Sequence, residues 1–251
     1  MMQSIFLSVV IPAYNEEATI EKVVCDHLEV LGSVSHLVGD WEMICLDDSS
    51  SDHTFEVLSQ LRERIAKLRV IHHEKNQGIY ESFTHLFMEA RGTHIYLTAA
   101  DDQWPAENLK RLVSALVSRK CDLVIGVRTN RREIYGVWRR VLSFVFNLIP
   151  RVLFGIETMD ANGIKLGVAD IFKFKLMSRS FFGEIERIVE AKKKGYQITF
   201  EPIQFLPRGG GKATGAKWKN ISAVLYDCMR YIGTHGISVR AFSETKTPSK
   251  I

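Results

Sequence analysis

Residues 97–105 read Leu97-Thr98-Ala99-Ala100-Asp101-Asp102-Gln103-Trp104-Pro105, and an apolar run from His94 leads directly into them. A short apolar run of this kind predicts a buried parallel strand. The run ends in two adjacent carboxylates and an amide, and open α/β sheets place their ligands at the carboxyl ends of their strands. Carboxylate and carbonyl oxygens suit hard cations such as Mg²⁺ or Mn²⁺. The stretch therefore predicts a site for a metal ion and a diphosphate.

Strands and helices alternate through the first half of the chain. Helices with one apolar face are predicted, with Asn15 expected to cap the first of them. Pro105 is expected to open the fourth helix. The predicted strands are 7–11, 41–46, 69–72, 94–98 and 123–127, and the predicted helices are 17–31, 54–67, 79–90 and the one after Pro105. Such alternation with short connections implies an α/β fold, a Rossmann-like and mostly parallel sheet covered by helices on both faces.

The second half of the chain has a less regular pattern. A strand or loop is predicted at 163–172, a helix at 180–193, a strand at 198–202 and a helix at 217–231. In the last helix, Ile221, Val224, Leu225 and Cys228 are predicted to face inward. We expect one domain over residues 1–235, with a first half at 1–128 and a second at 129–235. The polar residues 236–251 are expected to form a mobile tail.

The composition is that of an ordinary globular protein. Of the 251 residues, 46% are hydrophobic and 25% charged, and the net charge is only +4. The four cysteines show no spacing typical of a disulfide or zinc framework. No run of about 18 apolar residues is present, so no spanning helix is expected. The apolar N-terminus lacks a basic region, which favours a first strand over a signal peptide. The cysteines are interpreted as reduced core residues of a cytoplasmic protein.

Five short motifs follow one another in the first half. They are Val9-Val10-Ile11-Pro12-Ala13-Tyr14-Asn15-Glu16-Glu17, Cys45-Leu46-Asp47-Asp48-Ser49-Ser50-Ser51-Asp52-His53-Thr54, Asn76-Gln77-Gly78, Ala90-Arg91-Gly92 and the strand that ends at Asp101. Each is weak alone. In this order and spacing they resemble the inverting glycosyltransferases of family 2, which carry the GT-A fold. The resemblance covers roughly residues 5–128 and implies binding of a nucleotide-diphospho-sugar donor.

The resemblance implies a role for each strand end. Asp48 would accept a hydrogen bond from the nucleotide base, and Asp101 and Gln103 match the positions of metal ligands. The remaining donor-binding residues would be Pro12, Ala13, Tyr14, Glu16, Gln77 and Asp102. Asp52 has a simpler interpretation as a turn or cap residue. The implied cofactor is Mg²⁺ or Mn²⁺. The family usually has an acid at the position of Ala99, so one metal contact is missing here or is supplied by another group.

The second half resembles the polyprenyl-phosphate branch of that family, typified by dolichyl-phosphate mannose synthase. In that branch two arginines and a serine hold the lipid phosphate, and Arg128, Arg139 and Ser143 match them. The segment Asp160-Ala161-Asn162-Gly163-Ile164-Lys165-Leu166 and the loop from Arg208 to Lys212 match two further motifs, although Asn162 replaces a serine. Arg208 and Lys212 would offset the charge of the diphosphate. Arginine suits phosphate through its fork of donors.

A basic stripe accompanies these positions. Between Arg128 and Arg151 there are six arginines, no lysine and one acid, Glu133. We interpret the stripe as contact with a lipid phosphate and a membrane surface. A solvated basic face is the alternative, whereas nucleic acid is disfavoured because no recognised binding module is present. The apolar segment 141–156 is either a core helix or a segment that lies on a membrane.

The leading hypothesis is an inverting glycosyltransferase that moves a sugar to a polyprenyl (dolichyl or undecaprenyl) phosphate at the cytoplasmic face of a membrane. A phosphate oxygen is already an anion at neutral pH and needs no general base. Transfer to a sugar hydroxyl is the alternative, and it would need a base, for which Glu184 and Glu186 are the candidates. A non-catalytic nucleotide-sugar-binding module is a further alternative, motivated by Ala99 and Asn162. Whether a separate protein supplies a membrane anchor stays open.

Overall fold

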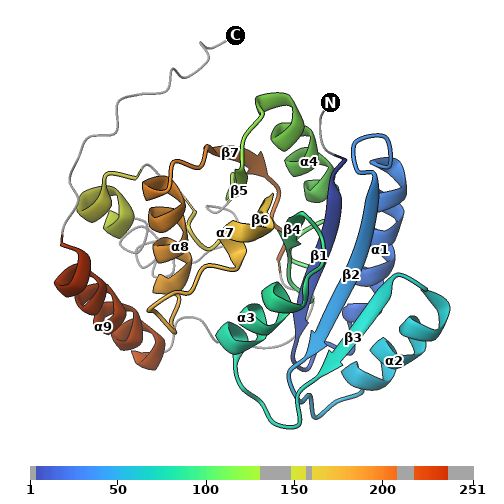
Figure 1. Ribbon diagram of the computed structural model, residues 1–251. Helices are drawn as coiled ribbons and strands as arrows, with labels where there is room; N and C mark the ends of the chain where they lie inside the picture. Colours follow the sequence, from blue (N-terminus) through green and yellow to red (C-terminus); the bar gives the residue numbers. More distant parts are fainter. Residues whose placement is uncertain (1–3, 131–147, 157–159, 208–217, 237–251) are drawn as a thin grey trace.

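The computed structural model describes residues 4–130, 148–156, 160–207 and 218–236. Within this part of the chain, the strands form one mixed sheet with helices on both faces (Figure 1). The strands are β1 (Phe6–Ala13), β2 (Asp40–Asp47), β3 (Leu68–His72), β4 (His94–Leu97), β5 (Leu123–Arg128), β6 (Lys165–Val168) and β7 (Ile198–Ile203). The helices are α1 (Ile20–Ser33), α2 (Thr54–Arg64), α3 (Ile79–Glu89), α4 (Glu107–Arg119), α7 (Ala169–Phe172), α8 (Phe182–Lys193) and α9 (Trp218–His235), with another helical segment at 148–154.

The sheet has the order β3-β2-β1-β4-β6-β5-β7. Strand β1 pairs in parallel with β2 on one side and with β4 on the other. Strand β6 lies antiparallel between β4 and β5. The predicted α/β fold with a mostly parallel sheet is confirmed. The segment predicted as a strand or loop at 163–172 supplies the one antiparallel strand of the described sheet, followed by the short helix α7.

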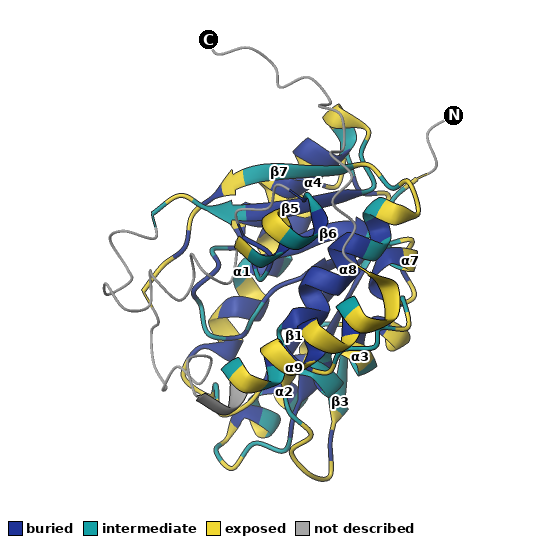
Figure 2. Cartoon of the chain, turned by 90° about the vertical axis from the view of Figure 1, so that its left-hand side faces the viewer, coloured by how far each residue is buried: buried dark blue, intermediate teal, exposed yellow. Residues whose placement is uncertain are grey.

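The helices bury two apolar clusters, one on each face of the sheet. Alternate residues of the central strands enter opposite clusters, as the period of two in a strand requires. Val9 packs on the face that α1, α2 and α4 cover, whereas Val10 packs on the face that α3, α8 and α9 cover. Figure 2 shows this buried sheet between exposed outer helix surfaces. Burial of both faces explains why the strands are continuous apolar runs in the sequence.

Three local expectations about helices were wrong. Helix α1 begins at Ile20, not at residue 17, because Glu16 to Thr19 form a turn before it. Asn15 does not cap this helix: its φ is +55°, and its side-chain oxygen accepts a hydrogen bond from the backbone of Ser51. Pro105 does not occupy the first position of α4, which begins two residues later at Glu107. Contacts between the loops after β1 and β2 therefore hold Asn15 away from the capping position that its residue type suggests.

Leu225 of α9 also differs from its expected position. Val224 and Cys228 face inward as predicted, but the Leu225 side chain is exposed. A helical period defines which residues share a face but not how wide the buried face is, and Leu225 falls on the exposed side of its border. Apart from Gly236, the expected tail at 236–251 lies outside the described residues. The division of residues 1–235 into two halves stays a prediction.

Gly92 explains one of the short motifs, and it yields a test of the fold. A Cβ atom at Gly92 would lie 2.6 Å from the carbonyl oxygen of Phe6 and 2.7 Å from the backbone nitrogen of Ser8. We expect Gly92→Ala to lower the free energy of unfolding by about 2 kcal/mol, because the backbone of β1 cannot move aside. Gly32→Ala in α1 has no neighbour within 4 Å and is expected to raise stability by about 0.5 kcal/mol. Urea denaturation of both variants measures the difference, and equal effects would contradict this packing.

Candidate active site

The carboxyl ends of β2, β1 and β4 lie at one edge of the sheet. Ala13 at the end of β1 is level with Asp47, and Leu97 at the end of β4 is level with Val10. Polar residues follow all three ends, so Tyr14, Asp48 and Asp101 lie around one edge. From β1 the chain continues through β2 and β3 on one side of the sheet and then crosses to β4 on the other side. The strand order therefore reverses next to β1. Such a switch point is where open α/β sheets bind ligands.

The loops after β1 and β2 are held together by hydrogen bonds. The backbone N–H of Asn15 donates to Ser50 Oγ at 2.9 Å, and that of Glu16 donates to Thr54 Oγ1 at 2.8 Å. Asp52 accepts from the backbone of Glu17 at 3.2 Å and of Thr54 at 3.0 Å, as expected of a turn and cap residue. The ring of Tyr14 remains 49% exposed beside these loops. An exposed aromatic ring on a fixed loop is suited to stacking against a nucleotide base.

Asp48 is buried and organises the turn at 76–78. Its carboxylate accepts from the backbone of Gln77 at 2.9 Å, from the backbone of Gly78 at 2.8 Å and from His73 Nδ1 at 2.7 Å. His73 Nε2 lies 2.9 Å from His85 Nδ1, which extends the chain of hydrogen bonds to α3. Gln77 therefore contacts Asp48 through its backbone N–H. The hydrogen bond from a nucleotide base to Asp48 stays a prediction. The base would donate to a carboxylate that already accepts hydrogen bonds from the turn at 76–78.

The residues after β4 diverge in direction. Asp101 accepts a hydrogen bond from the backbone of Gln103 at 3.2 Å. Asp102 has a φ of +54°, and its carboxylate lies 2.9 Å from Lys22 Nζ on α1. Gln103 donates its side-chain amide to the Leu206 carbonyl at 3.2 Å, and the Leu206 N–H donates to the Gln103 carbonyl at 2.8 Å. Asp102 is thus directed to α1, and Gln103 attaches this turn to the segment that follows β7.

The residues present can hold a metal ion only with help from a ligand. In the described ranges no group of three or more His, Cys, Asp or Glu side chains is arranged to bind one. Asp101 offers a carboxylate, Gln103 offers an amide oxygen, and Ala99 offers nothing. Mg²⁺ is commonly bound through one or two carboxylates together with substrate phosphates and water. The set therefore fits a cation that a diphosphate also coordinates, and it does not form a closed protein cage.

Arg128 at the end of β5 forms an ion pair with Asp160. Its Nε donates to Asp160 Oδ2 at 2.6 Å, and its Nη2 donates to Asp160 Oδ1. The guanidinium also lies 5.3 Å from the ring centre of Trp104 and 5.1 Å from that of Phe205. The pairing with Asp160 was not predicted, although the motif that contains this residue was noted. Four further residues were predicted to bind phosphate groups and lie outside the described residues. They are Arg139, Ser143, Arg208 and Lys212.

The two acids proposed as general bases are held by protein groups. Glu184 on α8 is buried, with Lys165 Nζ 2.9 Å and Arg187 Nε 3.5 Å from its carboxylate. Burial raises the pKa of Glu184, but the two cations outweigh that effect and lower its pKa overall. Glu186 accepts from the backbone of Met177 at 2.7 Å and of Ser178 at 3.0 Å. Glu184 therefore stabilises the structure as an anion and is a weak base, and the carboxylate of Glu186 is already engaged by backbone donors.

Lys165 and Tyr80 are residues of this region that the sequence reasoning missed. Lys165 is buried on β6 between two apolar neighbours, and such a charge needs a buried partner, which was the available signal. Tyr80 at the start of α3 has a buried hydroxyl without a hydrogen-bond partner in the described part of the chain. Burial raises the pKa of Tyr80, and the charges of Glu184 and Asp227 raise it further. No sequence pattern distinguishes Tyr80 from an ordinary core aromatic residue.

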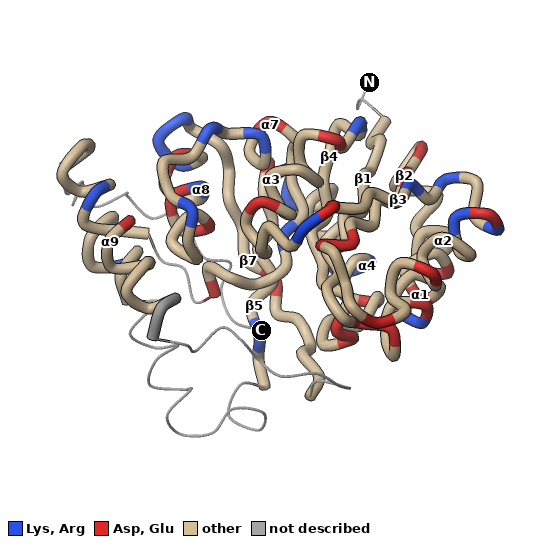
Figure 3. The backbone as a smooth tube through the Cα atoms, turned by 90° about the horizontal axis from the view of Figure 1, so that it is seen from below, with Lys and Arg blue, Asp and Glu red and all other residues tan. Residues whose placement is uncertain are grey.

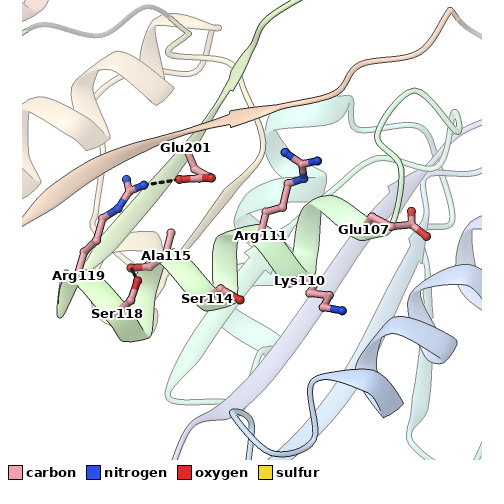
Figure 4. Close-up of a pocket in the computed structure, with 8 residues that line it drawn as sticks. All are labelled: Glu107, Lys110, Arg111, Ser114, Ala115, Ser118, Arg119 and Glu201. Atoms are coloured by element: carbon pink, nitrogen blue, oxygen red, sulfur yellow. Dashed lines mark hydrogen bonds and ion pairs between the residues drawn. The ribbon is translucent and has the colours of Figure 1, made fainter. Parts of the chain in front are cut away.

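An open groove of about 520 Å³ lies apart from these residues, along α4 (Figure 4). Arg119 at one end pairs with Glu201 of β7 at 2.6 Å. The lining is mostly charged and consists of Glu107, Lys110, Arg111, Ser114, Ala115, Ser118, Arg119 and Glu201. None of the predicted site residues lines this groove.

Comparison with known proteins places the chain in a family. The family model described as Glycosyl transferase family 2 matches residues 8–186, which include the ends of β1, β2 and β4 and the start of α8. The chain belongs to glycosyl transferase family 2. This confirms the family resemblance of the sequence motifs.

Similar curated proteins include two whose names contain a polyprenyl phosphate. The chain is 31% identical over 156 residues to the undecaprenyl-phosphate 4-deoxy-4-formamido-L-arabinose transferase of Pseudomonas savastanoi pv. phaseolicola, covering 62% of this chain and 44% of that protein. It is 31% identical over 195 residues to the dodecaprenyl-phosphate galacturonate synthase of Rhizobium johnstonii, covering 76% of this chain and 54% of that protein. The chain thus spans about half the length of these relatives.

Solved structures support the fold. Glucosyl-3-phosphoglycerate synthase from Mycobacterium tuberculosis, in complex with Mg²⁺ and uridine diphosphate, is similar with a TM-score of 0.64 over 90% of this chain and 80% of that chain. The sequence identity is 20%, so the likeness is one of fold, the GT-A fold predicted from the motifs. None of the described helices has the length and apolar character needed to cross a bilayer.

The ion pairs of Glu184 predict a pH-dependent effect of its replacement. We expect Glu184→Gln to lower the free energy of unfolding at pH 7 by roughly 3 kcal/mol, because Lys165 and Arg187 lose their buried anion. The folded pKa of Glu184 lies below its ordinary value of 4.5, so its contribution is present above that pH and is lost as the pH falls through the folded pKa. The difference between variant and parent should therefore shrink below pH 4.5.

The matched control for this measurement is Glu63→Gln on the exposed surface of α2. It should change stability by less than about 0.5 kcal/mol at either pH. Urea denaturation at neutral and acidic pH measures both variants. A Glu184→Gln variant as stable as the control at pH 7 would contradict the ion-pair arrangement.

Proposed function

We propose that this chain transfers a sugar, with inversion, from a nucleotide-diphospho-sugar to a polyprenyl phosphate. Membership of glycosyl transferase family 2 supports the transfer of a glycosyl group. Two relatives named for undecaprenyl-phosphate and dodecaprenyl-phosphate support a lipid phosphate as the acceptor. The arrangement of Tyr14, Asp48 and Asp101 around one sheet edge supports a donor site at the switch point. Glu16 belongs to the same loops, and Pro12 and Ala13 are the buried last residues of β1; the three would complete its wall.

One observation carries the choice of acceptor. A hydroxyl acceptor needs a general base, and a weak base that is already paired with cations serves poorly. The carboxylate of Glu184 is paired with Lys165 and Arg187, and that of Glu186 accepts hydrogen bonds from Met177 and Ser178. A phosphate acceptor brings its own negative oxygen and needs neither residue. The paired state of both acids therefore favours phosphate over hydroxyl.

The reaction follows from these groups. An oxygen of the acceptor phosphate attacks the anomeric carbon, and the bond from that carbon to the diphosphate breaks on the opposite face, which inverts the configuration. Arg128, Arg139 and Ser143 would orient the acceptor, which supplies proximity. Arg208 and Lys212 would offset the charge on the departing diphosphate. The roles of the four residues outside the described ranges rest on the sequence alone.

Asp101 and Gln103 would hold a divalent cation together with the diphosphate. A bound Mg²⁺ or Mn²⁺ would neutralise charge on the leaving group. The lack of a carboxylate at Ala99 makes the affinity for the free ion low, so the ion would enter with the donor. The proposed location is the cytoplasmic face of a membrane, where the protein would act peripherally. A membrane-anchoring partner protein is a separate hypothesis.

A direct assay tests this function. Purified protein is mixed with Mg²⁺, a short polyprenyl phosphate and a panel of radiolabelled nucleotide sugars, and lipid-soluble label is counted. We expect label with at least one donor, and its loss when EDTA removes the metal. The absence of lipid-soluble label with every donor of the panel would refute the proposal.

A pair of matched substitutions gives a sharper test of the site. We expect Asp101→Asn to lower the transfer rate by about a hundredfold or more, because the cation and diphosphate lose their carboxylate. Asp26→Asn is the matched control, since Asp26 lies on α1 and is paired with Lys22. It should lower the rate by less than about fivefold, which corresponds to about 1 kcal/mol. Equal losses in the two variants would contradict the assignment of Asp101 as the ligand.

A further inference from the structure

Helix α9 exposes large apolar side chains on its outer face. The side chains of Leu225, Tyr226 and Met229 are 52%, 63% and 66% exposed. Met229 is four residues after Leu225 and three after Tyr226, so the three share one face of the helix. The inner face is also apolar and packs against the second core cluster through Val224, Cys228 and Tyr231. A helix that is apolar on both faces is expected to be covered on both.

A second helical segment, 148–154, extends this surface. Its Phe154 packs edge-on against Tyr231 of α9, with the ring centres 5.5 Å apart. On its outer side Leu148 and Val152 are exposed, with Arg151 beside them. In Figure 1 this segment and α9 lie together at the left of the molecule, and in Figure 2 the exposed face of α9 is turned to the viewer.

The charges around this surface are mostly positive. The exposed cations include Arg151 and Arg230. Within residues 148–156 and 218–236 the one acid is Asp227, which is buried and accepts a hydrogen bond from the backbone of Arg179 at 3.0 Å. Figure 3 shows both blue and red positions on the neighbouring helix α8, where Glu190 is hydrogen-bonded to Lys193 and to Tyr231 of α9. An apolar face bordered by cations is complementary to a bilayer with anionic headgroups.

A second copy of the chain is a poorer occupant. In a two-fold pair the same patch would meet itself, so Arg230 and Arg151 of both copies would be brought close together. Like charges across an interface oppose association. An anionic lipid surface removes this repulsion and covers Leu225, Tyr226 and Met229 at the same time.

We propose that the outer face of α9, with Leu148 and Val152 of the adjoining segment, is the surface through which this protein docks on an anionic bilayer. Leu225, Tyr226 and Met229 enter the boundary between headgroups and acyl chains, and Arg151 and Arg230 contact the headgroups. The choice of a bilayer as the partner of α9 rests on the proposed function, because a polyprenyl phosphate is itself anchored in a bilayer. It deepens that function by naming the face that meets the lipid.

Sedimentation with lipid vesicles tests the docking face without any substrate. The vesicles are phosphatidylcholine with about a third phosphatidylglycerol, compared with phosphatidylcholine alone. We expect the parent protein to bind the anionic vesicles more tightly, and Met229→Asp to weaken that binding by about tenfold or more. Met88→Asp on α3 is the matched control, because Met88 is 62% exposed and the substitution is the same. The control should bind within about twofold of the parent.

Circular dichroism is used to check that each variant is folded. Tyr226→Asp provides a second variant on the same face. Equal vesicle binding by parent, Met229→Asp and Tyr226→Asp would overturn the proposal. So would a change from dimer to monomer in these variants, seen by analytical ultracentrifugation, with vesicle binding unchanged.

A transfer assay separates this proposal from the proposed function. With a short, water-soluble polyprenyl phosphate, Met229→Asp should transfer sugar as fast as the parent, and with a long acceptor embedded in vesicles it should be slower. If the parent transfers sugar to neither acceptor, the proposed function fails, while the vesicle-binding result still decides the docking face.

Discussion

Parallel pairing of β1 between β2 and β4 is the constraint on which the site depends. The pairing sets Ala13 level with Asp47 and Val10 level with Leu97, so three strand ends meet at one edge. Both faces of these strands are buried, and a shift of one residue would turn every buried side chain to the opposite face. Core packing therefore fixes the register, and the register fixes where Tyr14, Asp48 and Asp101 begin their loops.

The acids near this edge would repel an anionic diphosphate if they were all unpaired. Asp102 is paired with Lys22, and Asp160 is paired with Arg128. Asp48 accepts hydrogen bonds from two backbone amides and from His73. These partners lower the negative potential at this edge, since each nearby cation or donor offsets part of a carboxylate charge. Asp101 also has a partner, since its carboxylate accepts a hydrogen bond from the backbone of Gln103.

The sequence allowed the fold and the edge of the sheet to be predicted, because both depend on local periodicity. The strand that ends at Leu97 and the acid at Asp101 are examples, since an apolar run and the polar residues after it are visible in one short window. The partners of the charged residues were not predictable in this way. Lys22 and Asp102 are 80 residues apart, and their contact depends on how α1 packs. The exposure of the Leu225 side chain was also not predictable, because a helical period does not define how wide the buried face of a helix is.

The proposed acceptor site and the proposed docking face on α9 impose one geometric requirement on each other. A polyprenyl phosphate stays in the plane of its bilayer, so the cation that holds its phosphate must lie close to the surface that meets the lipid. Arg128 at the end of β5 is level with Ile203 at the end of β7. The chain that leads from β7 to α9 therefore leaves from the same edge of the sheet as Arg128. Under the proposed function, a bilayer against α9 must therefore also reach the edge of the sheet where Arg128 lies.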